Sequence, residues 1–167
     1  MHTSNSKQSL PLIILDMDEC LLHASAIPIK EIAADYKYQA LYVYFRPGVA
    51  QFLAQAAQCY QLAIWSTGTD AYVQALIAAV TPPNIHYAFV WGRSKCRKVK
   101  DDFFGYTHYY KSIDKLKRYG FSLESIIMID DTPAKIITNY AQVVEISAFK
   151  GEGDDNALSA LLADLIH

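Results

Sequence analysis

The sequence has few cysteines, no excess of either charge and no long apolar run, and each of these shortages excludes a class of protein. Its three cysteines, Cys20, Cys59 and Cys96, lie far apart, so neither a disulfide framework nor a cysteine zinc site is expected. Fifteen basic and seventeen acidic side chains give a net charge of -2, which offers nucleic acid no overall attraction. No apolar run approaches the roughly 20 residues of a membrane span. We therefore expect a soluble cytoplasmic monomer with neither a nucleic-acid nor a membrane partner.

The length is that of one domain. A chain of 167 residues, 52% of them hydrophobic, can bury a sizeable core, and about 150 residues per domain is usual. Residues 1–9 are polar and lack the apolar centre of a signal sequence, so we expect them to form a flexible N-terminal tail. Residues 10–167 are then expected to form a single domain.

Strand-like apolar runs alternate with helix-like periodic segments along this domain. The expected strands cover residues 10–16, 60–66, 86–91, 126–130 and 143–146. Helices are expected after Pro47, after Thr69, between Ser112 and Gly120, after Thr132, and along the leucine stripe at 158–165. Alternation of this kind is typical of βαβ units. The predicted fold class is α/β, with a doubly wound, mostly parallel, Rossmann-like sheet and helices on both of its faces.

One segment, at about residues 24–45, breaks the alternation. Its tyrosines Tyr36, Tyr38, Tyr42 and Tyr44 occupy even positions, and this period of two predicts a small β insertion directly after the first strand. An insertion at that point overhangs the end of the strand. Two interpretations stay open, namely an aromatic sheet packed on the core and a lid that shapes substrate entry.

Acidic side chains follow two of the expected strands. Asp16 and Asp18 come after the first apolar run, and the pair Asp130 and Asp131 closes a later one. Because ligands bind beyond the carboxyl ends of strands in open α/β sheets, these carboxylates are expected to converge on one crevice. They would repel each other unless a hard cation lay among them, and Mg²⁺ accepts carboxylate, phosphate and water oxygens. The sequence therefore predicts an Mg²⁺ site formed by these four aspartates.

The chain also contains the groups that phosphoryl transfer to a carboxylate requires. Asp16 can attack phosphorus, and Asp18 can protonate the leaving oxygen and later deprotonate a hydrolytic water. Lys111 can neutralise the charge of the phosphate and of the aspartyl intermediate. Taken singly, each of these residues has an ordinary structural explanation, such as a helix cap or a solvated cation. Their shared position at or just beyond different strand ends favours a common site.

Groups that can bind phosphate follow the second and third expected strands. Ser66 ends the second strand and can donate a hydrogen bond, as can the backbone of Thr67 and Gly68 beside it. Arg93 follows the third strand, and a guanidinium at a crevice edge can hold phosphate bidentately. The basic run at residues 93–100 could steer an anion, but two acidic residues follow it at once, so we favour a solvated loop.

A set of motifs follows in order along the chain: Asp16-Met-Asp18-Glu-Cys-Leu, Arg46-Pro47-Gly48, Ile64-Trp65-Ser66 with Tyr72, Arg93 with Cys96, Lys111, and Asp130-Asp131-Thr-Pro133. In this order they resemble the haloacid dehalogenase superfamily. Within it they are similar to the carboxy-terminal-domain phosphatases of RNA polymerase II, of the small phosphatase and NLI-interacting-factor type. The resemblance extends from about Leu12 to the last expected helix.

The resemblance implies a protein serine/threonine phosphatase that hydrolyses phosphomonoesters with Mg²⁺ through a phospho-aspartate. It implies that Asp16 is the nucleophile and a metal ligand, and that Asp18 is the acid/base and a ligand through its backbone carbonyl. It further implies a phosphate-binding hydroxyl at Ser66, a charge-neutralising role for Lys111 and metal ligation by Asp131. The substrate would be a phosphorylated protein or peptide.

Departures from the family pattern keep other functions open. Cys20 stands where the family usually has Thr, and the missing hydroxyl is expected to affect rate more than reaction type. The alternatives are a phosphatase for a small phosphorylated metabolite, a phospho-accepting receiver domain, and a binding module that has lost the chemistry. Receiver domains place the acidic doublet after the first strand, whereas here it comes late in the chain.

Overall fold

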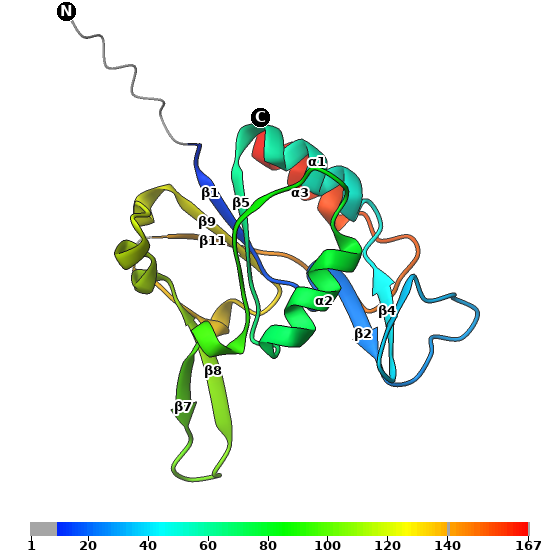
Figure 1. Ribbon diagram of the computed structural model, residues 1–167, viewed down its shortest axis with the longest axis horizontal. Coiled ribbons are helices and arrows are strands. Elements are labelled where there is room, and N and C mark those ends of the chain that lie inside the picture. The colour runs from blue at the N-terminus through cyan, green and yellow to red at the C-terminus, as the bar shows by residue number, and fades with distance from the viewer. Residues whose placement is uncertain (1–9, 140, 167) are drawn as a thin grey trace, which may run out of the picture.

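The structure is a computed structural model that describes residues 10–139 and 141–166 (Figure 1). The expected flexible tail lies outside the described residues. The main sheet has five strands in the order β11 (Gln142–Glu145), β9 (Ile126–Asp130), β1 (Leu12–Leu15), β5 (Gln61–Trp65) and β6 (Tyr87–Trp91). Each neighbouring pair is parallel. Strands β5 and β6 lie on one side of β1, and the later strands β9 and β11 lie on the other. The predicted doubly wound parallel sheet is therefore confirmed.

The central strand β1 separates two hydrophobic layers because its side chains alternate between the two faces of the sheet. Ile13 and Leu15 pack into the layer of the three α-helices, α1 (Val49–Cys59), α2 (Asp70–Val80) and α3 (Ala157–Ile166). Leu12 and Ile14 pack into the other layer, together with the 3₁₀ helices η2 (Ile113–Tyr119) and η3 (Leu123–Ser125). Helical segments therefore cover both faces, as predicted.

The α-helices begin and bury the faces that their sequences indicate. Gly48 precedes α1 with a φ of 77°, a backbone conformation that favours glycine, and α1 then buries Val49, Phe52, Leu53 and Ala56. Before α2, Thr69 is extended and leads into Asp70. None of the helices in residues 10–139 and 141–166 is long and apolar enough to cross a membrane.

Two expected helices are shorter and tighter than an α-helix. The segment after Ser112 is the 3₁₀ helix η2, which Gly120 ends with a φ of 85°. The segment after Thr132 is only the single 3₁₀ turn η4 (Pro133–Lys135), because the next two residues form β10 (Ile136–Ile137) and pair with β8. Two consecutive β-branched isoleucines suit that extended pairing better than a helix.

A hairpin occupies residues 97–112, whereas the sequence favoured a solvated loop for the basic run at residues 93–100. A 3₁₀ turn, η1 (Arg93–Lys95), leads into β7 (Arg97–Lys100), which pairs in antiparallel fashion with β8 (Thr107–Ser112). Together with β10 they form a sheet in the order β10-β8-β7. The hairpin projects from the body of the molecule (Figure 1). Its first strand is almost entirely polar, so no apolar alternation indicated it.

The tyrosine-rich insertion forms a separate antiparallel sheet in the order β2 (Leu22–Ser25), β4 (Leu41–Phe45) and β3 (Tyr36–Tyr38). This is the extended hairpin structure that the period of two predicts. Tyr36 pairs with Val43 and Tyr38 with Leu41, so these two tyrosines share the face opposite to that of Tyr42 and Tyr44. The insertion thus presents aromatic rings on both of its faces.

Candidate active site

The site begins at the carboxyl end of β1, where Asp16 leaves the sheet. The backbone N–H of Asp16 still donates to the carbonyl of Ile129 in β9, at 2.9 Å, which holds Asp16 against the neighbouring strand. Asp130 ends that strand, and its side chain is buried with only 1% of its surface exposed. The parallel pairing of β1 and β9 therefore brings the first and the last acidic motifs together.

Lys111 connects these two carboxylates. Its Nζ donates to Asp16 Oδ1 and to Asp130 Oδ2, both at 2.6 Å, and the side chain is 1% exposed. Lys111 lies near the end of β8, so the unexpected hairpin positions it. Burial alone would lower the pKa of Lys111, but the attraction of both carboxylates outweighs this effect and raises it. The amine is therefore a permanent cation between two acidic groups.

Lys111 offsets the burial of the Asp16 carboxylate only in part. Burial raises the pKa of Asp16 to about 7, the Lys111 charge opposes this, and the Asp130 charge adds to it. One ammonium thus compensates two buried carboxylates incompletely at neutral pH. A further cation beside Asp16 would stabilise its charged form.

The acidic groups provide a place for such a cation. Asp16, Asp130 and Asp131 each offer an oxygen atom, and these atoms lie within 4.8 Å of one another. Asp130 Oδ1 also accepts the backbone N–H of Thr132 at 2.8 Å, and Asp131 Oδ2 accepts the hydroxyl of the same residue at 3.1 Å. A set made only of carboxylate oxygens fits a hard cation such as Mg²⁺. Three of the four aspartates predicted for the metal site therefore gather in the structure.

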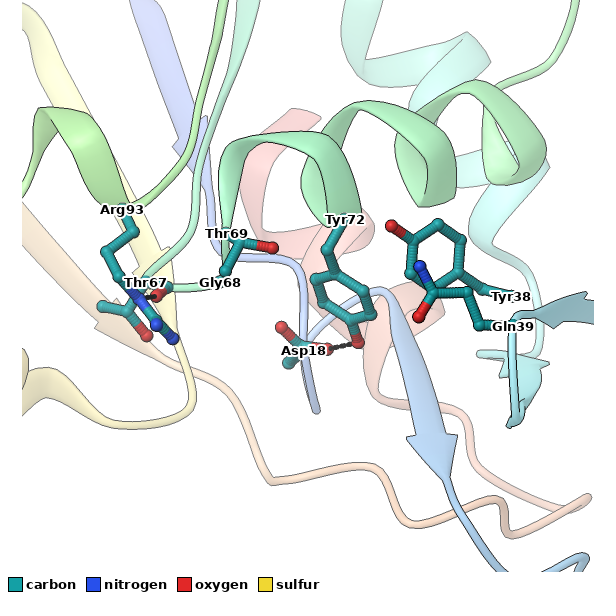
Figure 2. A pocket seen from close by; sticks show the side chains of 8 residues that line it. All are labelled: Asp18, Tyr38, Gln39, Thr67, Gly68, Thr69, Tyr72 and Arg93. Atoms are coloured by element: carbon teal, nitrogen blue, oxygen red, sulfur yellow. Dashed lines mark hydrogen bonds between the residues drawn. The ribbon is translucent and has the colours of Figure 1, made fainter.

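The carboxylate of Asp18 lies apart from this group and faces a different partner. The hydroxyl of Tyr72, on α2, donates to Asp18 Oδ1 at 2.6 Å (Figure 2). Burial raises the pKa of Asp18, and the Tyr72 hydrogen bond opposes the rise. Burial and the Asp18 charge also raise the pKa of Tyr72, so its hydroxyl remains a donor. Ligation of a metal through the backbone carbonyl of Asp18 stays a prediction.

Asp18 also lines a cavity of about 450 Å³. The cavity is lined by Asp18, Tyr38, Gln39, Thr67, Gly68, Thr69, Tyr72 and Arg93. In Figure 2, Arg93 and Thr67 lie to one side of Asp18, and Tyr38 and Gln39 of the insertion lie to the other. The Tyr38 ring packs edge-on against Tyr72, with centroids 5.5 Å apart. The insertion therefore packs on the core and also forms part of the cavity wall, and its role as a lid stays a prediction.

The segment after β5 supplies the backbone that was expected to bind phosphate. Ser66 is 1% exposed, and its Oγ accepts the N–H of Gly68 at 3.0 Å. A side chain at Gly68 would meet Tyr72 at 2.8 Å, a distance that real Cβ contacts essentially never show. Glycine therefore allows this turn to pack directly against the tyrosine that contacts Asp18.

Arg93 lies at the rim of the cavity. Its Nε donates to the carbonyl of Thr67 at 2.8 Å, and its guanidinium lies over the ring of Tyr109, 4.8 Å from the centroid. The side chain is exposed, yet these two contacts hold it in place. Of the predicted phosphate-binding residues, Thr67, Gly68 and Arg93 line the cavity, and Ser66 is buried behind them.

Arg46 is a residue whose importance was indicated only by its place in a family motif. It is 1% exposed and binds Asp155 bidentately, through Nε at 2.7 Å and a terminal nitrogen at 2.8 Å. It also donates to the carbonyls of Cys20, at 3.1 Å, and Ser147, at 2.8 Å. Arg46 thus ties the loop that carries Asp18 to the C-terminal part of the chain. No local pattern could identify Asp155 as its partner, because 109 residues separate the two.

Cys20, the residue that departs from the family pattern, lies fully buried in the same loop. Burial, reinforced by the Asp16 charge, raises the pKa of its thiol well above the usual value. The residue therefore stays a neutral thiol at neutral pH.

Solved structures share the fold of this chain, which is haloacid-dehalogenase-like. Fcp1, an essential RNA polymerase II CTD phosphatase, superimposes with a TM-score of 0.60 at 20% identity, covering 93% of this chain and 46% of that one. A haloacid-dehalogenase-like family hydrolase from Xanthomonas campestris gives a TM-score of 0.57 at 12% identity, covering 95% of this chain and 96% of that one.

The sequence model of the NLI interacting factor-like phosphatase family matches residues 11–167, so the chain belongs to this family of phosphatases. This confirms the resemblance noted in the sequence. Phosphatase PSR1 of Saccharomyces cerevisiae is 27% identical over 153 residues, which cover 87% of this chain and 33% of that protein. A probable C-terminal domain small phosphatase of Dictyostelium discoideum is 24% identical over 160 residues, covering 92% and 49%. The chain thus matches a third to a half of the length of these relatives.

Proposed function

We propose that this chain is an Mg²⁺-dependent phosphomonoester hydrolase that works through an aspartyl phosphate on Asp16. The observation that carries the proposal is the buried arrangement of Asp16, Lys111 and Asp130, with Asp131 close enough to complete a cation site. A nucleophilic carboxylate, a fixed positive charge and a cation site are the components that phosphoryl transfer requires. The adjoining cavity provides room for a substrate.

The residues have distinct roles in the proposed reaction. A carboxylate oxygen of Asp16 forms a bond to phosphorus while the bond to the leaving oxygen breaks, and Asp18 gives its proton to that oxygen. Asp18 then takes a proton from water, whose oxygen attacks phosphorus and releases phosphate and free Asp16. Lys111 offsets the charge on Asp16 throughout. Mg²⁺, held by Asp16, Asp131 and Asp130, would neutralise the phosphoryl oxygens.

Metal removal tests the proposal directly. We expect the protein to hydrolyse p-nitrophenyl phosphate with Mg²⁺ present, to lose this activity in EDTA, and to regain it when Mg²⁺ is added back in excess. The measurement is release of nitrophenolate, with circular dichroism recorded in the same buffers to show that the fold persists. Hydrolysis unaffected by EDTA would contradict the metal requirement.

A folded protein that binds Mg²⁺ but does not turn over would favour a non-catalytic function. In that case acetyl phosphate distinguishes the two remaining candidates. A persistent phosphoprotein would identify a receiver-like acceptor, and an unmodified protein would identify a phosphate-binding module. Rapid loss of the phosphoryl group would instead indicate hydrolysis.

Asp18→Asn is expected to slow turnover by roughly 10²-fold or more, the usual cost of removing a general acid/base. Because burial raises the pKa of Asp18, its carboxyl group stays protonated to a higher pH than an ordinary aspartate, and activity should fall as pH rises through that pKa. The variant should lose this alkaline limb of the kcat/KM profile. The measurement is a pH-rate profile of both proteins, and a variant that keeps both the rate and the limb would exclude the role.

The Tyr72 hydrogen bond allows a second test of the acid/base role of Asp18. Tyr72→Phe removes a donor that favours the charged carboxylate of Asp18, so the pKa should rise and the alkaline limb should move to higher pH. Tyr38→Phe is the matched control, because it also removes a hydroxyl from the cavity wall while Tyr72 still binds Asp18. An identical shift in both variants would show that the effect does not pass through Asp18.

We infer that the substrate is a phosphoserine or phosphothreonine side chain of a protein. The relatives named as C-terminal domain phosphatases support this substrate class. Arg93 at the rim and Tyr38 on the opposite wall could contact residues on both sides of a phosphorylated side chain. The volume of about 450 Å³ also suits a small phosphorylated metabolite, which remains the second candidate. The ratio of kcat/KM for phosphopeptides to that for sugar phosphates decides between them.

We further propose that the protein works as a monomer in the reducing cytoplasm. Cys20, Cys59 and Cys96 are all free thiols, as expected for that compartment. A negative net charge likewise favours a protein rather than a nucleic-acid substrate.

A further inference from the structure

The tip of the β7–β8 hairpin exposes three aromatic side chains. Phe103 is 88% exposed, Phe104 68% and Tyr106 66%. The Phe104 ring lies between the other two, with its centroid 4.9 Å from that of Phe103 and 6.3 Å from that of Tyr106. We call these three side chains the knob. They belong to the turn between β7 and β8, and this turn forms the end of the projecting hairpin (Figure 1). An apolar group exposed in this way indicates a contact surface.

The turn that carries the knob is held in one conformation. Asp101 Oδ1 accepts the backbone N–H groups of Phe103, at 2.8 Å, and Phe104, at 2.9 Å. The backbone of Asp101 also accepts from Gly105, at 2.9 Å, and donates to Tyr106, at 2.7 Å. Gly105 has a φ of 72°, which favours glycine. Because the backbone is fixed, the rings are presented before any partner binds, which lowers the entropic cost of binding.

The knob belongs to the positively charged part of the molecule. Residues 93–118 contain nine Lys or Arg side chains and three Asp, a net charge of +6 in a chain whose total is -2. Lys111 alone among the nine is buried. Arg97, Lys98 and Lys100 are exposed along β7, directly behind the aromatic tip. The positive charge is thus concentrated in one segment of the chain, and the exposed basic side chains of β7 next to the knob attract anions.

We propose that this hairpin docks the protein onto an anionic phospholipid surface, with the knob of Phe103, Phe104 and Tyr106 inserted at the boundary between headgroups and acyl chains. Aromatic rings are favoured at that depth, and basic side chains just behind them reach the lipid phosphates. A fluid lipid surface accepts a projecting knob without a preformed pocket. Single-stranded nucleic acid is the less suitable anion, because its bases stack on separate rings along a groove, whereas these rings pack on each other.

Docking in this way does not depend on catalysis, but it would determine where the proposed active site works. Strand β8 connects the tip directly to Lys111, and the five residue steps from Tyr106 to Lys111 span roughly 17 Å at about 3.3 Å per step. The site would therefore lie close above the lipid surface. The expectation of no membrane partner rested on the lack of a spanning run, which a peripheral contact does not need.

The test uses the full chain and sedimented vesicles. We expect binding to vesicles of phosphatidylcholine and phosphatidylserine in equal amounts, and much weaker binding to phosphatidylcholine alone. The double variant Phe103→Ser, Phe104→Ser should bind the anionic vesicles about tenfold more weakly or worse. Lys98→Glu with Lys100→Glu should reduce binding to the anionic vesicles selectively. The matched control is Ile27→Ser, which removes an exposed apolar side chain (76% exposed) outside the basic segment and should leave binding unchanged.

Several results would overturn the proposal. One is the absence of binding to anionic vesicles by a folded protein, and another is equal binding by the wild type and the Phe103, Phe104 variant. Binding of a single-stranded oligoribonucleotide but not of vesicles, lost in that variant, would identify a nucleic-acid surface instead. Self-association of the wild type in sedimentation equilibrium, lost in the same variant, would identify a second copy of the chain as the partner. Thermal unfolding of each variant confirms that the exposed substitutions leave the fold intact.

Discussion

Replacing Asp16 by asparagine is expected to reduce turnover by roughly 10⁴-fold or more, the scale of loss seen when a catalytic nucleophile is removed. An amide oxygen is a poor nucleophile toward phosphorus and a weaker ligand for a hard cation than a carboxylate. The change also removes one of the two charges that flank the ammonium of Lys111. The measurement is hydrolysis of p-nitrophenyl phosphate at saturating Mg²⁺, with the wild type prepared in parallel.

The matched control is Asp164→Asn on the exposed surface of α3, which makes the same chemical change away from the site and should keep wild-type activity. Asp16→Asn should remain folded, because asparagine is nearly isosteric and its oxygen can still accept from Lys111. Near-normal turnover in the folded variant would disprove the aspartyl-phosphate mechanism. A loss of activity caused by unfolding would show in circular dichroism and would not count in its favour.

Arg46→Ala is expected to lower the free energy of unfolding by about 3–5 kcal/mol, the usual result of removing one partner of a buried ion pair. The substitution leaves the Asp155 carboxylate without its bidentate partner and removes the donor to the carbonyls of Cys20 and Ser147. Urea denaturation measures the change. A loss below about 1 kcal/mol, typical of an exposed pair, would show that the arrangement is not a buried anchor.

Two further variants separate geometry from charge. Arg46→Lys keeps the positive charge but not the planar guanidinium group. Its free energy of unfolding should therefore lie between those of the wild type and Arg46→Ala. Lys150 forms an ion pair with Glu19, in the same loop that Arg46 binds, but the Lys150 side chain is 60% exposed. Lys150→Met should therefore change the free energy of unfolding little. Equal destabilisation by Lys150→Met and Arg46→Ala would contradict the assigned role of burial.

Much of the fold could be predicted because the apolar runs were long enough to show their period. The apolar runs around Ile13 and Ile127 predicted two buried strands. Each run ends in an aspartate, so Asp16 and Asp130 were expected at the same edge of the sheet. Parallel pairing of β1 with β9 then follows from the doubly wound order. The convergence of these two residues was thus implicit in the sequence, although the distance between them was not.

The β7–β8 hairpin could not be predicted, because its strands lack an apolar face. Only Val99 interrupts the polar residues of β7, and the pairing with β8 depends on backbone hydrogen bonds that any residue type can make. Lys111 therefore read as a cation before a helix, whereas it is a buried strand residue. The exposure of the aromatic side chains at residues 103–106 could not be predicted either, since exposure is a property of the folded chain.

The sequence by itself determined the fold class, the family and the set of residues proposed to react, because periodicity and motif order are local properties that a linear chain displays. Only the tertiary structure decided which groups meet: Lys111 between Asp16 and Asp130, Tyr72 on Asp18, and Arg46 on Asp155. These contacts join residues far apart in the chain, and their strength comes from burial, which raises pKa values and strengthens ion pairs. Burial exists only after strands and helices have packed, so no local pattern records it.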